Sequence, residues 1–475
     1  MINDINKKNA KHWRLNYHIE PPVGLLNDPN GLAYFNGEYF IFYQWNPTGC
    51  IHANKHWALV KTKDFISYTK PEKVLAPNKW YNKNGCYSGS AIVANEKLEI
   101  LYTGNVKDKD NNRSSYQCRV TIDKDCKIEE KGPVVDKIPE GYTADFRDPK
   151  LFEKNGVYYF IIGVKTKDNK GRVLLYKSSN FQNWDFEGEI KTSYEEFGYM
   201  WECPNLFELG GKDVLIFSPQ GLEKEEYRYQ NIYQSGYISG KLDYDTLKFE
   251  HNEFRELDYG TDFYAPQIFQ DNKGRTIMYG WMGLPEEENL QQTSKFGWVY
   301  SLTMPRELTL KDQIIYQKPI DEMKNFRQGK IEQVNNLVTE SLKIENIKEN
   351  SYEFILDFER CKAEKVEIRF AASDNDYSVF SLDFKNNLGI LDNSNRANSP
   401  NSVRKFIIQD ESNFKINMFV DKSAVEIYFQ DGREVLSSRI YPNEDSTNLN
   451  ILSYNGKINI TNLIVYSMGG INYGR

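Results

Sequence analysis

A tight turn followed by a dense apolar strand recurs five times in the first two-thirds of the chain. Successive turns are about 60 residues apart, and self-similarity at a nearly fixed period indicates a repeat architecture. The strands are rich in β-branched and aromatic residues and helical periodicity is scarce, so each period has room for roughly four strands. The turns lie at Asn36-Gly37, Asn95-Glu96, Asn155-Gly156, Gly210-Gly211 and Lys273-Gly274.

Four strands per repeat are the content of one propeller blade, so the repeats predict a five-bladed β-propeller over about residues 20–320. A generic run of hairpins in a sandwich is the alternative arrangement of the same strands. From about residue 336 the pattern changes to alternating strands separated by polar turns such as Gln430-Asp431-Gly432, which is typical of an antiparallel β-sandwich.

The predicted fold class is therefore all-β, a five-bladed β-propeller followed by a C-terminal β-sandwich. For the polar lead before the first repeat we expect a turn or two of helix around residues 9–14, docked by Trp13 and Tyr17. The predicted domains are the propeller with its lead at 1–322, a linker at 323–335 and the sandwich at 336–475.

Composition argues against several classes of partner. The 60 basic and 67 acidic residues give a net charge of −7, and no long basic run is present, so nucleic acid is not an expected partner. The first residues are polar and no apolar stretch has membrane-spanning length, so we expect a cytoplasmic protein with no membrane partner. Six cysteines without a Cys-x-x-Cys pair predict reduced thiols, and five histidines outside metal-ligand spacing predict neither a metal nor another cofactor.

A short polar signature precedes each repeated turn. In a propeller the innermost strands line the central channel, so equivalent positions converge on one axis, and Asp28, Asp148 and Glu202 would project into a single funnel. Any one Asp-Pro step alone would be a turn or a cap. Three carboxylates crowded together repel one another and resist ionising together, so their placement by chance is improbable and an active site is favoured. The signatures are Asn27-Asp28-Pro29, Tyr87-Ser88-Gly89, Arg147-Asp148-Pro149, Glu202-Cys203-Pro204 and Asp262-Phe263-Tyr264.

Carboxylates that flank a bound sugar permit glycoside hydrolysis, in which one attacks the anomeric carbon and another donates a proton to the leaving oxygen. Glu202 has the apolar sequence neighbours Trp201 and Cys203. We expect them to desolvate the carboxyl and raise its pKa, which would favour the protonated acid. Asp28 has amide groups nearby, which would favour the ionised nucleophile. Arg147 beside Asp148 would keep that second aspartate charged.

Six motifs in order resemble glycoside hydrolase family 32, the invertase and fructan-hydrolase family, and the late segment VDKSAVEIYFQDG at 420–432 is similar to its sandwich domain. The resemblance implies a five-bladed propeller with a β-sandwich and retaining hydrolysis of terminal β-D-fructofuranosides. The motifs are NDPNG at 27–31, FRDPK at 146–150, ECP at 202–204, GTDFYAPQ at 260–267, GWM at 280–282 and LTMPREL at 302–308.

Within these motifs, the resemblance implies that Asp28 is the nucleophile, Asp148 the transition-state stabiliser and Glu202 the acid/base. It further implies that the fructosyl unit is held by Asn27, Gln44, Ser88, Arg147, Tyr264 and Trp281. Tryptophans offer flat apolar faces to a sugar ring, and besides Trp281 we include Trp57 as a candidate contact. Core packing is the alternative role for these indoles.

The stretch Ile51–Trp57 departs from the Trp-Gly-Asn that many family members carry there. Together with GYMWECPNLF at 198–207 and SPQG at 218–221, it looks most like the bacterial branch that hydrolyses sucrose 6-phosphate. The phosphate would lie on the glucosyl side at the rim of the funnel, and we predict His52 and Lys55 as its leading contacts.

The expected partner is thus a small sugar or sugar phosphate, and the sequence leaves the oligomeric state open. A plain invertase, a fructan exo-hydrolase and a fructosyltransferase are rival enzymes, because all pass through the same fructosyl intermediate. A non-catalytic sugar-binding protein is the rival from another class. The intact pair of Asp28 and Glu202 argues against that last reading, since a binding module needs no acid beside a nucleophile.

Overall fold

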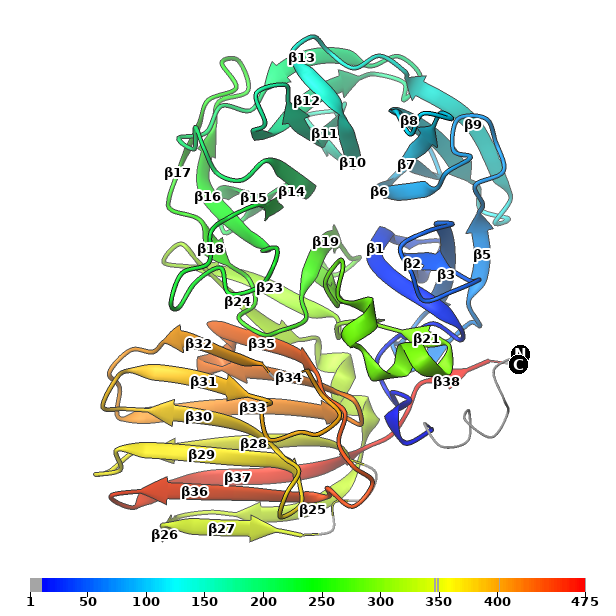
Figure 1. Cartoon of the computed structure of the whole chain (residues 1–475). Helices are drawn as coiled ribbons and strands as arrows, with labels where there is room; N and C mark the ends of the chain where they lie inside the picture. The colour runs from blue at the N-terminus through cyan, green and yellow to red at the C-terminus, as the bar shows by residue number, and fades with distance from the viewer. Residues whose placement is uncertain (1–10, 346, 348–349, 401, 475) are drawn as a thin grey trace.

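The computed structural model describes residues 11–345, 347, 350–400 and 402–474. Five antiparallel sheets stand around one axis as the blades of a propeller, and a sandwich of two sheets packs against one side of the ring (Figure 1). The predicted five-bladed β-propeller with a C-terminal β-sandwich is confirmed. Within the described residues, no helix has the length and apolarity needed to span a membrane.

In each blade the innermost long strand lies at the axis and the next three strands of the main path follow outward in chain order. Blade one contains β1 (Gly24–Phe35), β2 (Glu38–Asn46) and β3 (His56–Thr62), with β4 (Ser67–Tyr68) and β5 (Glu72–Leu75) outside. Blade two contains β6 (Cys86–Ala94), β7 (Lys97–Lys107), β8 (Arg113–Ile122) and β9 (Ile128–Val135). Blade three contains β10 (Tyr142–Lys154), β11 (Val157–Thr166), β12 (Gly171–Ser178) and β13 (Asp185–Glu189).

Blades four and five carry extra short strands. Blade four contains β14 (Met200–Leu209), β15 (Lys212–Gln220), β16 (Gly236–Leu242), β17 (Phe249–His251) and β18 (Arg255–Glu256). Blade five contains β19 (Tyr264–Gln270), β20 (Thr276–Met282), β22 (Ser301–Leu302), β23 (Arg306–Lys311) and β24 (Ile314–Pro319). Short 3₁₀ helices η2 (Glu288–Leu290) and η3 (Gln292–Phe296) precede β21 (Trp298–Val299), which pairs parallel with β1.

The repeated turns set the register of the blades. In four of the five turns both central residues have positive φ, as Asn36 (51°) and Gly37 (79°) do, which is the geometry of the type I′ hairpin. This turn continues the right-handed twist of the strands, so Phe35 pairs directly with Glu38. The local sequence thereby fixes where the second strand of a blade lies against the first.

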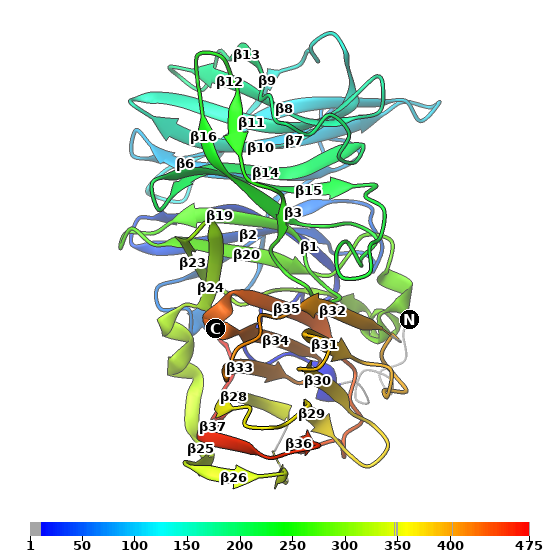
Figure 2. The ribbon, with the colours of Figure 1, turned by 90° about the vertical axis from the view of Figure 1, so that its left-hand side faces the viewer.

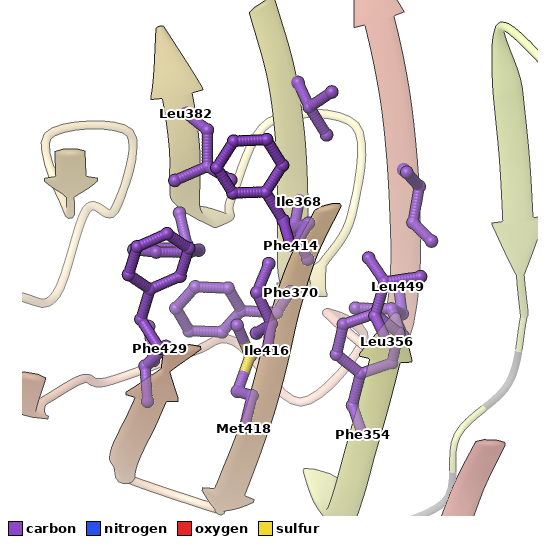
Figure 3. Close-up of a cluster of buried hydrophobic side chains, with 14 of the residues drawn as sticks. Phe354, Leu356, Ile368, Phe370, Leu382, Phe414, Ile416, Met418, Phe429 and Leu449 are labelled. Atoms are coloured by element: carbon purple, nitrogen blue, oxygen red, sulfur yellow. The ribbon is translucent and has the colours of Figure 1, made fainter. Parts of the chain in front are cut away.

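The sandwich buries an apolar core between its two sheets, in which Phe354, Phe370, Ile416 and Phe429 meet (Figure 3). One sheet contains β25 (Arg327–Val334), β26 (Leu337–Thr339), β28 (Ser351–Glu359), β33 (Asn413–Asp421), β34 (Ala424–Phe429), β35 (Glu434–Arg439) and β37 (Ile458–Met468). The other contains β27 (Ser341–Ile344), β29 (Lys365–Ala372), β30 (Ser378–Asp383), β31 (Leu388–Asp392), β32 (Val403–Ile407) and β36 (Asn448–Tyr454). The short helix η6 (Gln430–Gly432) follows β34.

The segment predicted as a linker at 323–335 is largely a strand of the sandwich. After η4 (Asp321–Phe326), β25 pairs antiparallel with β37. β25 lies at the edge of its sheet and most of its side chains are exposed, so it carries no alternating apolar signal that sequence reasoning could detect.

Trp13 and Tyr17 dock the polar lead as expected, and the structure adds that Trp13 contacts the sandwich. After η1 (Lys11–Trp13), the Trp13 indole N–H donates to the Pro442 carbonyl at 2.9 Å, and Tyr17 is buried. Residues 9 and 10 of the predicted helical turn lie outside the described residues. At the other end of the chain, β38 (Asn472–Tyr473) returns to the propeller and pairs with β4.

A buried ionic network joins the propeller to the sandwich where β35 lies against blade five (Figure 2). Arg306 Nη1 lies 3.0 Å from Asp258 Oδ2, and Arg306 Nη2 lies 2.6 Å from Glu426 Oε2. His18 bridges the two sandwich carboxylates, with Nδ1 2.8 Å from Asp421 Oδ2 and Nε2 3.0 Å from Glu426 Oε1. All five side chains are fully buried. Two motifs of the resemblance, LTMPREL and VDKSAVEIYFQDG, therefore meet at the domain interface.

This network predicts a pH-dependent stability. Burial alone would lower the pKa of His18, but its hydrogen bonds to Asp421 and Glu426 outweigh burial and raise the pKa to about 9. Because the folded pKa lies above the unfolded value, the stabilisation is complete below about pH 6.5 and is lost as pH rises through about 9. We expect the free energy of unfolding by urea to fall by up to about 3 kcal/mol between these pH values.

The matched variant is His18→Gln, which removes the titrating ring and should show a smaller loss over the same pH range. An equal pH dependence in this variant would mean that another group, and not His18, carries the effect.

Candidate active site

Every innermost strand interrupts its pairing at the polar signature. The register shifts lie between Leu26 and Pro29, Cys86 and Gly89, Arg147 and Lys150, Glu202 and Asn205, and Tyr264 and Gln267. A β-bulge of this kind re-aims a side chain, and bulges are common beside active sites. At three of them a non-glycine residue takes a positive φ: Asp148, Cys203 and Ala265.

Polar side chains from one blade satisfy backbone N–H groups of the next blade around these bulges. Asn30 Oδ1 of blade one accepts from Gly89 N of blade two at 3.1 Å, and Ser90 Oγ of blade two accepts from Leu151 N of blade three at 2.7 Å. Asp148 Oδ2 of blade three accepts from Cys203 N at 3.1 Å, and Asn205 Oδ1 of blade four accepts from Ile268 N at 3.2 Å. The bulges are thus held between neighbouring blades.

The starts of the innermost strands enclose a cavity of about 190 Å³ on the propeller axis. The three predicted carboxylates all line it, as do eight of the nine predicted substrate-binding residues. The lining residues are Asn27, Asp28, Gln44, His52, Lys55, Tyr87, Ser88, Arg113, Arg147, Asp148, Glu202, Gln220, Tyr264, Trp281 and Pro285.

Asp28 stands at the floor of this cavity. Its carboxylate accepts hydrogen bonds from the Ser88 hydroxyl and, at 3.1 Å, from Asn27 Nδ2. Burial raises the pKa of Asp28, and the Ser88 hydrogen bond and the positive charge of Lys55 oppose that rise. The amides expected to surround Asp28 are present, but desolvation is the larger influence on this carboxyl.

Asp148 is buried beside Asp28 and Glu202. Burial raises the pKa of Asp148 to about 7; the negative charge of Glu202 adds to the rise and Arg147 opposes it. Arg147 was expected to keep Asp148 charged; its charge does oppose the rise in pKa, but burial and Glu202 outweigh it. The Arg147 guanidinium bonds to Glu202 and Asp145.

The apolar wrapper predicted for Glu202 is absent. Side chains alternate along β14, so Trp201 packs into the core of blade four while Glu202 faces the cavity. The Glu202 carboxylate accepts from Arg147 Nε at 2.9 Å, Gln220 Nε2 at 3.0 Å and the Tyr264 hydroxyl at 2.6 Å. Its environment is polar and rich in donors.

Lys55 and His52 do not lie together at the rim. The Lys55 ammonium is buried and donates to Asn27 Oδ1 at 2.5 Å, which places it at the floor beside Asp28. Burial lowers the pKa of Lys55 to about 7, against the opposing charge of Asp28. His52 stands higher, with Nε2 2.8 Å from Glu288 Oε1 and its ring 5.3 Å from that of Trp281.

Trp57 is the one predicted contact that does not line the cavity. It is fully buried between Phe42 and Tyr102, at the junction of blades one and two. Its indole N–H donates to the Tyr87 carbonyl at 3.0 Å. Trp57 therefore supports the bulge of blade two rather than offering a face to a ligand.

Sequence reasoning missed Tyr87, Gln220 and Pro285 as cavity residues. Gln220 ends β15 and pairs with Met200 at the start of β14, as Gln44 near the end of β2 lies opposite the start of β1. The hairpin register carries this signal: the end of a second strand lies beside the start of the innermost one. Gln220 belongs to the SPQG motif, which the sequence analysis singled out without assigning Gln220 to the cavity.

A larger cavity, of about 760 Å³, opens at the opposite ends of the innermost strands. It is lined by residues such as Tyr34, Val93, Asn155 and Asn272, next to the hairpin turns. The predicted carboxylates do not line it, so the smaller cavity at the starts of the strands is the candidate active site.

Comparison with known families gives two matches that together cover most of the chain. Residues 18–319 match the glycosyl hydrolases family 32 N-terminal domain, and residues 322–467 match the glycosyl hydrolases family 32 C-terminal domain. Both domains of that family are therefore present and in the same order.

Curated relatives and solved structures agree with these matches. The chain is 42% identical to a sucrose-6-phosphate hydrolase of Bacillus subtilis (strain 168), over 91% of this chain and 90% of the relative. A sucrose-6-phosphate hydrolase of Staphylococcus xylosus is 37% identical, over 94% and 91% of the two chains.

Among solved structures, a sucrose-6-phosphate hydrolase from Lactobacillus gasseri superposes with a TM-score of 0.89 at 30% identity, covering 98% of this chain and 95% of that one. A mutant β-fructofuranosidase of Bombyx mori in complex with sucrose gives a TM-score of 0.84 at 30% identity, covering 99% and 98%.

The crowded carboxylates predict a retained proton in the cavity. With a pKa of about 7, Asp148 should be protonated at pH 5.5 and ionised at pH 8.5, both roughly 1.5 units from the midpoint. Infrared difference spectra between these pH values should show a carboxylic acid C=O band that disappears as pH rises, and Asp148→Asn should remove it.

The control is Asp168→Asn, in an exposed loop where hydrogen bonds, first that from Thr166, lower the pKa of the carboxyl. Asp168 is ionised throughout the range, so this variant should keep the band. A band that survives in Asp148→Asn would assign the proton to another member of the cluster.

Proposed function

Because the chain belongs to glycosyl hydrolase family 32, we propose that it hydrolyses the fructofuranosyl bond of sucrose 6-phosphate, and of sucrose, with retention of configuration. The observation that carries the proposal is the convergence of Asp28 and Glu202, distant in sequence, on one small cavity. The similarity to sucrose-6-phosphate hydrolases over nine-tenths of both chains supports the phosphorylated substrate.

In this proposal Asp28 attacks the anomeric carbon of the fructosyl unit. The bond to the leaving oxygen breaks, Glu202 gives that oxygen its proton, and a fructosyl ester forms on Asp28. Glu202 then takes a proton from water, the water oxygen attacks the anomeric carbon, and Asp28 leaves as a carboxylate. Each atom and proton is accounted for in these two steps.

The acid role requires Glu202 to hold a proton when the substrate binds. Arg147, Gln220 and Tyr264 all donate to this carboxyl, and burial raises the pKa of its neighbours Asp28 and Asp148. A tightly interacting cluster shares its protons, so the acid form of Glu202 arises by redistribution of a proton that the cavity already retains near neutral pH.

The remaining lining residues would hold the fructosyl ring. Asp148 and Arg147 offer charged partners for its hydroxyls, and Asn27, Gln44 and Ser88 offer neutral ones around Asp28. Trp281 would supply the apolar face. Lys55 would act from below, since its charge favours the ionised form of Asp28 that a nucleophile needs.

We propose a cytoplasmic location for the reaction. The six cysteines are all free thiols, as is usual for proteins of a reducing compartment. A sugar phosphate is also a charged substrate that does not cross a membrane unaided.

The test of the proposed function is the ratio of kcat/KM for sucrose 6-phosphate to that for sucrose, measured on the purified protein. A charge-assisted contact to phosphate contributes roughly 1.5–3 kcal/mol, so we expect a ratio of about 10 to 150. Equal values for both substrates would make the protein an ordinary β-fructofuranosidase without phosphate preference.

Replacing the nucleophile should stop turnover. Asp28→Asn cannot form the ester, so hydrolysis of both substrates should fall below detection, whereas Asp168→Asn at the surface should keep its activity. Rapid quenching of the wild-type reaction followed by peptide mass spectrometry should find the fructosyl adduct on Asp28. An adduct mapped to Asp148 would reverse the two assignments.

Replacing the acid should depend on the leaving group. Glu202→Gln should lower kcat on sucrose by roughly 10²-fold or more. The loss should be much smaller in the first step with fructosyl fluoride, whose leaving group needs no protonation. Glu208→Gln, on the same strand but at its far end, is the matched control. Equal losses on both donors would assign Glu202 to binding.

A further inference from the structure

Five rim loops surround the mouth of the candidate active site. The second strand of each blade runs antiparallel to the innermost one, so its end lies beside the starts of the innermost strands. The loops that follow these second strands therefore form the rim, and any part of a substrate outside the cavity meets them. They span 47–55, 108–112, 167–170, 221–235 and 283–297.

Charge is distributed unevenly around this rim. The loops of blades four and five are acidic: 283–297 carries Glu286, Glu287 and Glu288 against one lysine. The loops of blades two and three, with the strand ends that flank them, are basic: 107–113 contains three cationic residues against two aspartates, and 165–170 contains three against one. A dianion at the rim is therefore repelled on one side and attracted on the other.

On the basic side of the rim, three cations are held together by one carboxylate, that of Asp145. Asp145 Oδ1 lies 2.7 Å from Arg113 Nη1 and 2.7 Å from Arg147 Nη1, and Asp145 Oδ2 lies 2.9 Å from Lys165 Nζ. Asp145 is desolvated, but these three cations outweigh its burial and lower its pKa to about 2. Asp145 thus pairs with three cations, one of which, Arg147, also pairs with Glu202. Three positive charges face two negative ones, so the cluster keeps a net positive charge that can bind a further anion.

The cluster extends outward from the proposed acid. Arg147 bonds Glu202 on one side and Asp145 on the other, and Asp145 in turn holds Arg113, which lines the cavity. The side chains of Arg113 and Lys165 are each 27% exposed, so both ends remain accessible. Glu202 must face the oxygen that joins fructose to the leaving sugar, so that sugar lies next to this cluster.

The other candidates for a phosphate contact are less well placed. Lys55 is bonded to Asn27 at the floor, beside the carboxylate that would attack the fructosyl unit. His52 is already paired with Glu288, and Glu286 and Glu287 lie in the same loop. Arg228 pairs with Glu225 in the acidic loop of blade four.

We propose that Arg113 and Lys165 form the subsite for the phosphomonoester of the leaving sugar and so determine the preference for a phosphorylated substrate. This inference rests on the proposed function. The guanidinium of Arg113, ordered by Asp145 and lying 5.8 Å from the centre of the Tyr87 ring, offers further N–H donors to phosphate oxygens. Lys165 adds a second positive charge on the other side of the same carboxylate.

The experiment measures kcat/KM for sucrose 6-phosphate and for sucrose in Arg113→Ala, Lys165→Ala and the double variant. Each single change should lower the ratio of the two values by roughly 10-fold, because one charge-assisted contact is lost. The double change should lower the ratio further. Inhibition by the product glucose 6-phosphate should weaken in parallel, relative to inhibition by glucose.

Arg228→Ala and Lys295→Ala are the matched controls, since each removes a cation from an acidic rim loop, and both should keep the wild-type ratio. Arg113→Gln is the second variant at the central position, because it keeps a donor for Asp145 without the charge and should also lower the ratio.

The outcomes separate the two proposals. A wild-type preference for sucrose 6-phosphate that survives in the double variant overturns this subsite and leaves the proposed function intact. A wild-type protein without any preference overturns this subsite and the preference for the phosphorylated substrate, and leaves the hydrolysis of sucrose standing. A ratio that falls equally in the control variants assigns the preference to the general charge of the rim and overturns the subsite.

Discussion

The site depends on five breaks in backbone pairing that occur at the same height around the axis. A bulge leaves backbone groups without their ladder partners, and such groups are costly when buried. Here side chains of the neighbouring blade accept from N–H groups beside the bulges, as Asn30 does for Gly89 and Asn205 does for Ile268. Blades one to four therefore each stabilise the distorted strand of the next, and the side chains at these bulges are held over the cavity.

This arrangement explains why the polar signatures contain more than their carboxylates. In NDPN and ECPN the final asparagine is fully buried and points along the ring rather than into the cavity. Asp148 has both roles: it lines the cavity, and its Oδ2 accepts from the backbone of Cys203. A substitution of Asp148 will therefore alter the geometry of blade four as well as the chemistry of the site.

The repeat and its turns were enough to predict the fold, because type I′ turn residues and dense β-rich strands act locally. The carboxylates could be predicted because a propeller converts equal positions in a period into neighbours in space. The surroundings of each carboxyl group could not be predicted in the same way. Glu202 has apolar neighbours in sequence, yet Trp201 packs into the core on the other side of β14. The surroundings of Glu202 come from Arg147, Gln220 and Tyr264 on other strands.

Trp57 and Lys55 lie elsewhere than expected for a related reason: Trp57 does not line the cavity, and Lys55 lines it away from the rim. The sequence shows that a residue lies near the start or end of a strand. It does not show whether the side chain reaches the rim of the cavity, its floor or the neighbouring blade. The indole of Trp57 turned into the junction of two blades, and the long side chain of Lys55 reached inward to Asn27. The strand β25 was missed because an exposed edge strand has no apolar period.

The first and last parts of the chain are bound to each other's domains. Segment 13–18 ahead of blade one is held by the sandwich through Pro442, Asp421 and Glu426, while β38 adds to blade one after the sandwich is complete. During synthesis the propeller leaves the ribosome first, but its opening segment lacks these sandwich contacts until residues beyond 420 have emerged. The domain made first therefore gains its full set of contacts only after the sandwich has been made.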